Sequence, residues 1–486
     1  MKSLRALGTI LVIVGLLGCG DDGSSGDGTD GPDGAVDGAV DDGRPDGAGG
    51  AAAASGDSGG GSGGNDPTAG SGGNGGAGSG GDSGSGGAGG DSGGSSGEGG
   101  ASGGASGDGG DGGEPMPIDE SAELYDPTNL PRFDITLPQE SMDGLNMDPD
   151  TYVPGELRYG DEVVANIGVR IKGEYSKRTL AQKAAFKLKF DEFVDKQEFR
   201  GLRRMTLNNM IEDPSFIAER LSYHVYRAAG LPAPRCNSAL VYVNGELFGV
   251  YANVETEDKT FLRRWFEDED GNLYEEGQAD FRYGSEDYFE LETNEMENDR
   301  TDLVALIEVV ENTTPETLLA DISPLLDMDH FMKFTALEGL VNQWDMYGYT
   351  RFFPNNFRFY HDPTSDKFVF IPWGMDMSMK PYNEQQYIGM LEVAKDGTVD
   401  TAGKIFIYCL QSTECRTQYI AVIEEMLELF EGEDLETLAE AYFDQVRPDI
   451  DLDTRKELSS MLVDEKYMQV IEHIQGRGAA VRADLE

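Results

Sequence analysis

A long run near the N-terminus of this chain contains almost no large apolar side chain. From about residue 20 to residue 114 the sequence is mainly Gly, Ser, Asp and Ala. Such a composition cannot bury enough apolar surface to offset the chain entropy lost on folding. We therefore expect a disordered linker over residues 19–115 and one folded part over 116–486, which is long enough for a large core or for two lobes.

The charge of the chain limits its partners. The formal net charge is −52, and acidic runs at 267–270 and 431–434 place part of it in the folded region. Such a chain offers nothing to replace the counterions condensed on a nucleic acid backbone, so no nucleic acid partner is expected. Solubility and repulsion from anionic surfaces explain the charge most simply, and attraction of divalent cations is the alternative.

The first residues have the pattern of an export signal. Lys2 and Arg5 precede an apolar run that ends at Leu17, too short to span a bilayer but typical of a signal peptide. Residues 16–19, LLGC, resemble the lipobox of bacterial lipoproteins, in which the cysteine is lipidated. The sequence thus predicts a signal peptide over 1–18, lipidation of Cys19, and an exported protein anchored in the cell envelope, at the outer membrane or cell surface. A plain signal peptide with an incidental cysteine is the alternative.

The other cysteines and the histidines suggest no catalytic or zinc site. Cys409 and Cys415 are close in sequence, and export permits them to form a disulfide. Cys236 is then left over beside an apolar run, which favours a buried structural thiol. The four histidines lack ligand spacing, so neither a zinc site nor a histidine-based triad is predicted.

The periodicity of the folded part changes along the chain. Residues 161–209 alternate as antiparallel strands, Asp213-Pro214 begins a helix that Gly230 ends, and Asn244-Gly245 joins a hairpin. Helical spacing dominates after residue 301, at 302–310, 316–326, 330–342, 418–430 and 435–446. The predicted fold is α+β, with a strand-rich N-terminal lobe over about 116–300, a mostly helical C-terminal lobe over about 301–486, and a cleft between them.

A short aromatic hairpin interrupts the helical region. Its strands flank a turn at 361–363, and Asp345 lies on the loop before them, Asn356 opens the first strand, and Asp376 follows the second. Groups at the open ends of paired strands converge. One base and two oxygen ligands around a metal-bound phosphate are typical of phosphoryl transfer. Alternatively, each of these side chains caps a turn.

Many of these segments, taken in order, resemble the CotH family, whose members are atypical protein kinases with a diverged kinase fold. The similarity spans most of 166–379. It is carried by 170–173 with Ser176, Lys183 with the strand 186–190, 207–209 with 213–215, 241–245 leading to 249–251 and Glu255, 271–274, 344–345, 356–357 with Tyr360, and 371–373 with Asp376.

The resemblance implies roles for the hairpin residues and for several others. A kinase-like order assigns Asp345 as the catalytic carboxylate and Asn356 and Asp376 as ligands of Mg²⁺ or Mn²⁺. ATP phosphates need a cation and a flexible backbone, and the cation is usually held by a helix carboxylate. The nucleotide-binding candidates, each alternatively an ordinary strand, helix or surface residue, are Lys172 and Gly173 with Ser176 as a phosphate loop, Lys183 or Lys187, Glu219 as the helix carboxylate, and Glu255 near the adenine.

One position departs from the family pattern. Family members typically carry Pro-Trp-Asp-x-Asp, whereas Gly374 stands at the first acid here. The leading hypothesis is a lipid-anchored kinase that transfers the ATP γ-phosphate to Ser or Thr hydroxyls of envelope or surface proteins. The alternative is a catalytically degenerate kinase-like surface protein that acts as a binding, adhesion or structural module, and both Gly374 and the scarcity of ATP outside the inner membrane favour it.

Overall fold

The computed structural model describes residues 119–380, 387–393, 395–396 and 399–486. The predicted signal peptide, Cys19 and the predicted linker lie outside the described residues. In the described ranges, no helix has the length and apolar character needed to cross a bilayer. Helices and strands both contribute, so the α+β class is confirmed.

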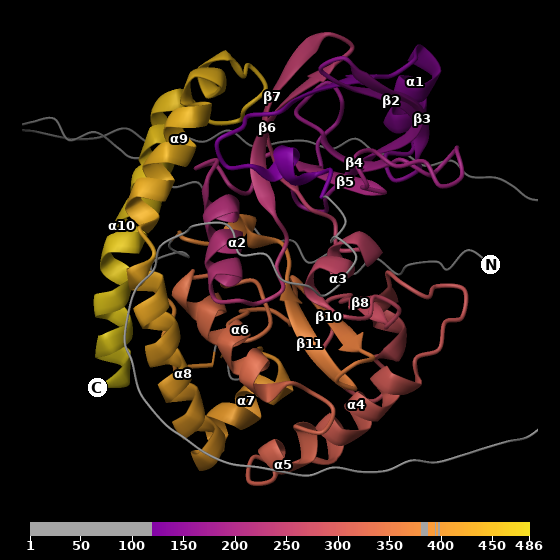
Figure 1. Ribbon diagram of the computed structural model, residues 1–486. Coiled ribbons are helices and arrows are strands. Elements are labelled where there is room, and N and C mark those ends of the chain that lie inside the picture. Colours follow the sequence, from indigo (N-terminus) through magenta and orange to yellow (C-terminus); the bar gives the residue numbers. More distant parts are fainter. Residues whose placement is uncertain (1–118, 381–386, 394, 397–398) are drawn as a thin grey trace, which may run out of the picture. The chain divides into compact units, whose positions relative to one another are not determined.

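A closed barrel of seven strands occupies the N-terminal part of the described chain (Figure 1). Strand β1 runs parallel to β6, and the other neighbours in the barrel are antiparallel. The order around the barrel is β1 (Arg132–Thr136), β2 (Val153–Tyr159), β3 (Glu162–Lys172), β4 (Ala185–Lys189), β5 (Arg204–Asn208), β7 (Glu246–Val254) and β6 (Cys236–Val243). The predicted strands between 161 and 209 and the predicted hairpin at Asn244-Gly245 are confirmed.

Side-chain alternation sorts the barrel strands into an apolar inside and a polar outside. Ile171 of β3 and Phe186 and Leu188 of β4 are buried in the barrel core. Lys172 and Lys187 alternate with them and therefore point outward from the same two strands. The outer face of β3 and β4 thus presents lysines to the rest of the chain.

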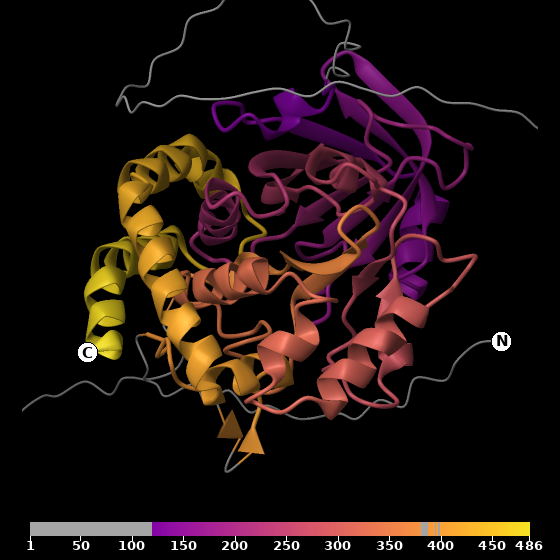
Figure 2. The same cartoon turned by 60° about the horizontal axis from the view of Figure 1, so that its bottom comes forward.

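Helices α8 to α10 run along one flank in both Figure 1 and Figure 2, and α9 contacts β7 of the barrel. Short 3-10 helices occur at η1 (Ala122–Tyr125), η2 (Glu286–Tyr288) and η3 (Met375–Met377). The α-helices are α1 (Gln139–Met147), α2 (Ala218–Ala228), α3 (Lys259–Trp265), α4 (Thr301–Asn312), α5 (Leu318–Ile322), α6 (Met328–Leu340), α7 (Lys404–Gln411), α8 (Thr413–Gly432), α9 (Leu435–Leu452) and α10 (Ser460–Leu485).

The helices predicted after residue 301 are confirmed with altered ends, and two further helices were missed. Helix α5 is shorter than the predicted 316–326, and α7 and α10 were not predicted. Helix α10 contains Gly476 and Gly478, residues of poor helix propensity. A Cβ on Gly476 would overlap the Tyr387 hydroxyl, and one on Gly478 would overlap the Glu431 carboxylate. Close packing therefore favours glycine at both positions.

Helix α2 begins later than predicted. Phe216 has a positive φ of 66°, which interrupts the helical backbone, so α2 starts at Ala218 and not at Asp213-Pro214. The Asp213 carboxylate nevertheless accepts a hydrogen bond from the Glu219 N–H at 3.0 Å, in the first turn of α2. Helix α2 contacts β6, α6, α9 and η3, and its buried side chains join the core of the C-terminal helices. It therefore connects the barrel with that core.

The predicted aromatic hairpin is part of a larger sheet. Strands β10 (Phe357–Asp362) and β11 (Lys367–Pro372) pair antiparallel, and β10 also pairs with β8 (Leu273–Glu275), which pairs with β9 (Glu290–Leu291). A separate pair is formed by β12 (Lys395–Asp396) and β13 (Val399–Asp400). Strands β8 and β9 were missed because each has at most three residues.

Candidate active site

Asp345 and Asn356 meet at the open end of the β10–β11 hairpin. The Asn356 Nδ2 donates to the main-chain oxygen of Asp345 at 2.7 Å and to its carboxylate Oδ2 at 3.0 Å. Asn355 donates to the same Oδ2 at 3.1 Å. Burial raises the pKa of Asp345 to about 7, and the negative charge of Asp376 acts in the same direction. The loop therefore holds a carboxyl group whose pKa suits proton transfer near neutral pH.

Asp376 lies on η3, just past β11. Its carboxylate makes no hydrogen bond or ion pair with any residue that the structure describes, while its charge acts on Lys172, Glu219 and Asp345. The Ser378 hydroxyl donates to the Met375 carbonyl at 2.6 Å and lies 2.6 Å from the Ser222 hydroxyl of α2. Helix α2 and the turn that carries Asp376 are thus fastened to each other.

Gly374 occupies a backbone conformation suited to glycine. Its φ is 60° and its ψ is 49°, in the left-handed region. The Asn356 carboxamide packs against it, so a Cβ at this position would lie 2.5 Å from the Asn356 Oδ1. The loss of the family acid at 374 therefore leaves room that the Asn356 side chain fills.

Lys172 and Glu219 are joined by a third side chain. The Lys172 Nζ donates to the Asn208 Oδ1 at 2.5 Å, and the Asn208 Nδ2 donates to the two Glu219 carboxylate oxygens at 2.8 and 3.1 Å. Lys172 ends β3, Asn208 ends β5 and Glu219 lies in the first turn of α2. The amide of Asn208 thus links the strand lysine to the helix carboxylate.

Burial governs the charges of this group. It lowers the pKa of Lys172, against the favourable charges of Glu219 and Asp376. Burial and the charge of Asp376 raise the pKa of Glu219 to about 8, although the Asn208 amide and the Lys172 ammonium act in the opposite direction. Because both pKa values respond to the charge of Asp376, Lys172, Glu219 and Asp376 belong to one electrostatic group.

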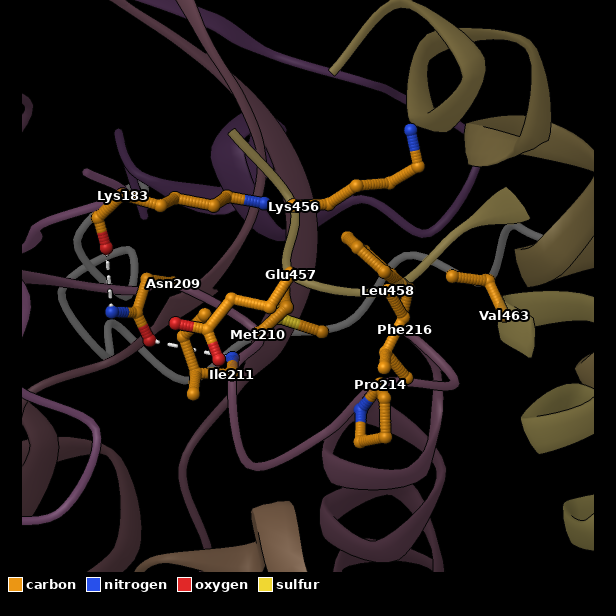
Figure 3. A pocket seen from close by; sticks show the side chains of 10 residues that line it. All are labelled: Lys183, Asn209, Met210, Ile211, Pro214, Phe216, Lys456, Glu457, Leu458 and Val463. Carbon is orange, nitrogen blue, oxygen red and sulfur yellow. Dashed lines mark hydrogen bonds between the residues drawn. The ribbon is translucent and has the colours of Figure 1, made fainter. Parts of the chain in front are cut away.

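The loop between β3 and β4 begins directly after Lys172. Gly173 has a φ of 102°, and a Cβ there would lie 2.5 Å from the Ser176 Oγ. The Asn209 Nδ2 donates to the Ser176 carbonyl at 2.9 Å. It also donates to the Lys183 carbonyl at 2.7 Å (Figure 3). Gly173 and Ser176 therefore shape a tight turn beside Lys172.

The Lys183 side chain does not contact Lys172, Asn208 or Glu219, which corrects the expectation that it could contact phosphates. Its ammonium forms a buried ion pair with Asp453 at 2.5 Å, and the two side chains are 1% and 0% exposed. A buried cation needs such a carboxylate partner, so the side chain is held in the protein interior. Lys187 lies on the Lys172 face of the barrel, where Glu292 and Glu275 oppose the lowering of its pKa by burial. Of these three lysines, Lys172 is the one that Asn208 joins to Glu219.

The Glu255 carboxylate is held by two arginines. Its carboxylate forms ion pairs with Arg235 at 2.8 Å and with Arg264, and it is 1% exposed. It also accepts from the Arg235 backbone N–H at 3.0 Å. These contacts correct the expectation of a carboxylate free to meet the adenine, because a buried acid with two cationic partners is structural.

Three polar residues of the site were missed in the sequence. Asn208 bridges Lys172 and Glu219, Asn355 donates to Asp345, and Glu276 accepts from the Asn356 backbone N–H at 3.0 Å. Alternation gave a signal for Asn208, since Thr206, two residues earlier on β5, pairs with Lys187 of β4 and lies on the same face of the strand as Asn208. Glu276 gave none, because it follows a strand of three residues.

The donor set fits a hard divalent cation. Asn356 Oδ1 and the Asp376 carboxylate accept no hydrogen bond within the described part of the chain, and such oxygens are the ligands that Mg²⁺ prefers. Over the same residues, no group of three or more His, Cys, Asp or Glu side chains is arranged to hold a metal ion. A cation here would therefore need further oxygens from phosphates or water.

Among the described residues, two cysteines are paired and one is free. Cys409 of α7 and Cys415 of α8 form a disulfide that joins the two helices, and Cys236 of β6 is a buried free thiol. Burial raises the pKa of Cys236, which disfavours the reactive thiolate.

The fold is α+β, and its candidate site combines a strand lysine, a helix carboxylate and a hairpin bearing an amide and two acids. The family described as CotH kinase protein matches residues 169–481, well over half of the chain. The chain belongs to this family.

Two curated relatives and one solved structure show how far the similarity extends. The inner spore coat protein H of Bacillus subtilis is 23% identical over 375 residues, which cover 74% of this chain and 98% of that protein. The invasin CotH3 of Rhizopus delemar is 26% identical over 186 residues, 35% of this chain and 30% of that protein. A Helicobacter pylori proinflammatory kinase, CtkA, is 9% identical with a TM-score of 0.26, over 62% of this chain and 95% of that one.

Proposed function

We propose that the protein is a kinase that binds ATP with Mg²⁺ or Mn²⁺ and transfers the γ-phosphate to a Ser or Thr hydroxyl of another protein. The observation that carries this proposal is the joint placement of two groups. Asp345 and Asn356 meet at the mouth of the hairpin, and the charge of Asp376 links them to the Lys172–Asn208–Glu219 group. Family membership supports the proposal.

The residues divide the work of phosphoryl transfer. Lys172, oriented by Asn208 and Glu219, would bind the nucleotide phosphates, and Asn356 and Asp376 would hold the divalent cation. The cation would neutralise charge on the phosphate oxygens. The bond between the γ-phosphorus and the oxygen of departing ADP breaks, a bond to the hydroxyl oxygen forms, and Asp345 accepts the hydroxyl proton.

We also propose that the protein works at the outside of the cell. The predicted signal peptide and lipidated Cys19 support a lipid-anchored envelope protein, and the predicted linker supports reach from the membrane to protein substrates at the surface. Fractionation of cells that carry Cys19→Ala tests the anchor. A variant that stays in the membrane fraction like the wild type would contradict it.

Phosphate transfer tests the enzymatic proposal directly. The purified full chain is incubated with ATP labelled at the γ-phosphate and Mg²⁺ or Mn²⁺, and label is followed in the protein itself and in added envelope extract. The expected result is metal-dependent label on Ser or Thr that is absent from Asp376→Asn. A wild type that transfers no label under any of these conditions would count against a kinase.

A second candidate function is a binding or structural module on the same scaffold. Gly374 replaces an acid of the family pattern and has a left-handed backbone conformation. The Asn356 carboxamide occupies the space that a side chain at this position would need. The names of two relatives, an inner spore coat protein and an invasin, also suit a surface module. This function predicts partner binding without nucleotide.

The substitution Gly374→Asp separates the two functions. If the wild type binds no nucleotide and the variant does, the protein is a degenerate kinase. If neither form binds nucleotide while a surface partner still binds both, the module is favoured. If the wild type already binds and transfers phosphate, the missing acid is dispensable and Asp376 suffices.

A further inference from the structure

The connector between α9 and α10, residues 453–459, contacts the loop between β3 and β4, residues 173–184. Asp453 forms the buried ion pair with Lys183. The Arg455 Nη1 donates to the carbonyls of Leu180 at 3.1 Å, Ala181 at 3.1 Å and Gln182 at 2.7 Å. The Arg455 side chain therefore binds three consecutive backbone carbonyls of the loop, which holds the loop backbone in one conformation.

A second ion pair and a glycine complete this contact. Glu457 of the connector pairs with Arg178 of the loop through two contacts of 2.5 and 3.1 Å. A Cβ on Gly249 of β7 would overlap the Asp453 carboxylate, so the barrel has room for Asp453 only because this residue is glycine. The small cavity beside the contact, about 20 Å³ in volume, is large enough for a single water (Figure 3).

The loop 173–184 runs from Lys172 toward the segment that contacts Asn356. It begins at Gly173, and the Glu174 carboxylate accepts a hydrogen bond from Gln278 at 3.4 Å. Gln278 is two residues from Glu276, which accepts from the Asn356 N–H. The start of the loop therefore extends from the barrel to the segment that contacts Asn356.

Two adjacent asparagines connect the loop with the lysine. Asn208 binds Lys172 and Glu219, whereas Asn209 donates to the Ser176 carbonyl in the loop. Asn209 also donates to the Lys183 carbonyl (Figure 3). The carbonyl of Lys183 binds Asn209 while its ammonium binds Asp453. A displacement of the connector would thus be transmitted through Lys183 to Asn209 and its neighbour Asn208.

We infer that Asp453 and Arg455 are positioning residues, which hold the loop 173–184 in place beside Lys172 so that it can cover the phosphates of bound ATP. The coverage of phosphates rests on the proposed function. The positioning of the loop rests on the contacts alone, so the two parts can be tested separately.

Trypsin provides a probe of the loop, because Lys177 and Arg178 lie within it. Cleavage of a folded protein at such sites requires local opening. The purified full chain, Asp453→Asn and Arg455→Ala are digested, and cleavage after Lys177 and Arg178 is followed by mass spectrometry. Both variants should be cut there about tenfold faster than the wild type, a typical size for such coupling. Arg455→Ala keeps the test decisive if loss of the buried Asp453 charge unfolds the protein.

The matched control is Asp464→Asn. Asp464 binds Arg447 at 2.7 Å between α9 and α10, and it makes no contact with the loop in the described structure. In the Asp464→Asn protein, trypsin should cut the loop 173–184 at the wild-type rate. Unchanged cleavage in Asp453→Asn and Arg455→Ala, or an equal increase in Asp464→Asn, would overturn the inference.

The ligand half of the inference has its own readout. With MgATP present, cleavage of the wild-type loop should slow, and in Arg455→Ala the KM for ATP should rise about tenfold while kcat changes less than about threefold. A wild-type loop that MgATP does not protect would contradict the proposed function. The comparison of Arg455→Ala with Asp464→Asn without nucleotide would still decide whether the connector positions the loop.

Discussion

Asn356 orients Asp345 by donating from one amide nitrogen to both its main-chain oxygen, at 2.7 Å, and its carboxylate, at 3.0 Å. The amide oxygen of Asn356 faces Gly374 and stays available to a cation. One side chain therefore serves the two parts of the proposed site, since it holds the base with its nitrogen and presents a metal ligand with its oxygen.

Substitution of the base should abolish transfer and spare binding. Asp345→Asn keeps the size and removes the proton acceptor, so kcat for phosphate transfer should fall by about 10²- to 10⁴-fold. Nucleotide affinity, measured by calorimetry, should change little. The control is Asp161→Asn on the exposed turn between β2 and β3, which should behave as the wild type. An Asp345→Asn protein with normal kcat would exclude this residue as the base.

Asn208 should matter nearly as much as the lysine that it holds. Asn208→Ala removes the link between Lys172 and Glu219, and we expect the Kd for MgATP to rise about tenfold, as for other hydrogen bonds to charged groups. Lys172→Met should weaken binding further. Lys189→Met is the matched control, because Lys189 lies on the same outer face of β4 and pairs with Glu192. Equal losses in Lys189→Met would show that only strand stability is affected.

Gly374→Ala should destabilise the protein and disturb the cation site together. A left-handed alanine costs about 1–2 kcal/mol, and its Cβ would meet the Asn356 carboxamide. We expect a lower midpoint in urea unfolding and a higher Mg²⁺ requirement. Gly160→Ala is the control, since Gly160 also has a positive φ but open space around it. A loss of stability without any change in Mg²⁺ requirement would separate Gly374 from the site.

Glu338 should contribute to a fall in stability as the pH rises. Burial raises its pKa from 4.5 to about 8, although its carboxylate accepts hydrogen bonds from the N–H groups of Gly348 and Tyr349. The folded state therefore keeps a proton that the unfolded chain releases above pH 4.5, so this contribution is full below pH 4.5 and is lost as the pH approaches 8.

The measurement is chemical unfolding at several pH values between 5 and 8.5. The wild type should lose stability over this range, and Glu338→Gln should lose less. Parallel curves for the two proteins would show that Glu338 does not keep its proton in the folded state.

The sequence predicted the parts of the site that depend on local order and not those that depend on long-range pairing. Asp345, Asn356 and Asp376 flank one hairpin within residues 345–376 of the sequence, and Asp345 and Asn356 form a hydrogen bond, which agrees with the convergence that this order suggested. Lys183, in contrast, pairs with Asp453, a residue 270 positions away. No local pattern distinguishes a lysine with such a partner from one that is free to bind phosphate.

The fold shows the same division. Alternation in β3 and β4 predicted antiparallel strands, but the closed barrel was not predicted, because β1 pairs with β6 through a long-range parallel contact. The late start of α2 depends on the positive φ of Phe216, which propensity does not indicate. Helix α10 was not predicted because it contains Gly476 and Gly478, which have poor helix propensity. Both glycines are needed there for close packing against Tyr387 and Glu431.

The most direct test of the central claim is thermal unfolding of the wild type and Asp376→Asn with ATP, with Mg²⁺ and with both. A ligand at 100 times its Kd adds about 2.7 kcal/mol to stability. We predict that ATP and Mg²⁺ together raise the melting temperature of the wild type, that either alone does so much less, and that Asp376→Asn loses the joint effect. A wild type that ATP and Mg²⁺ do not stabilise, or an Asp376→Asn protein stabilised to the same extent, would contradict the proposed site.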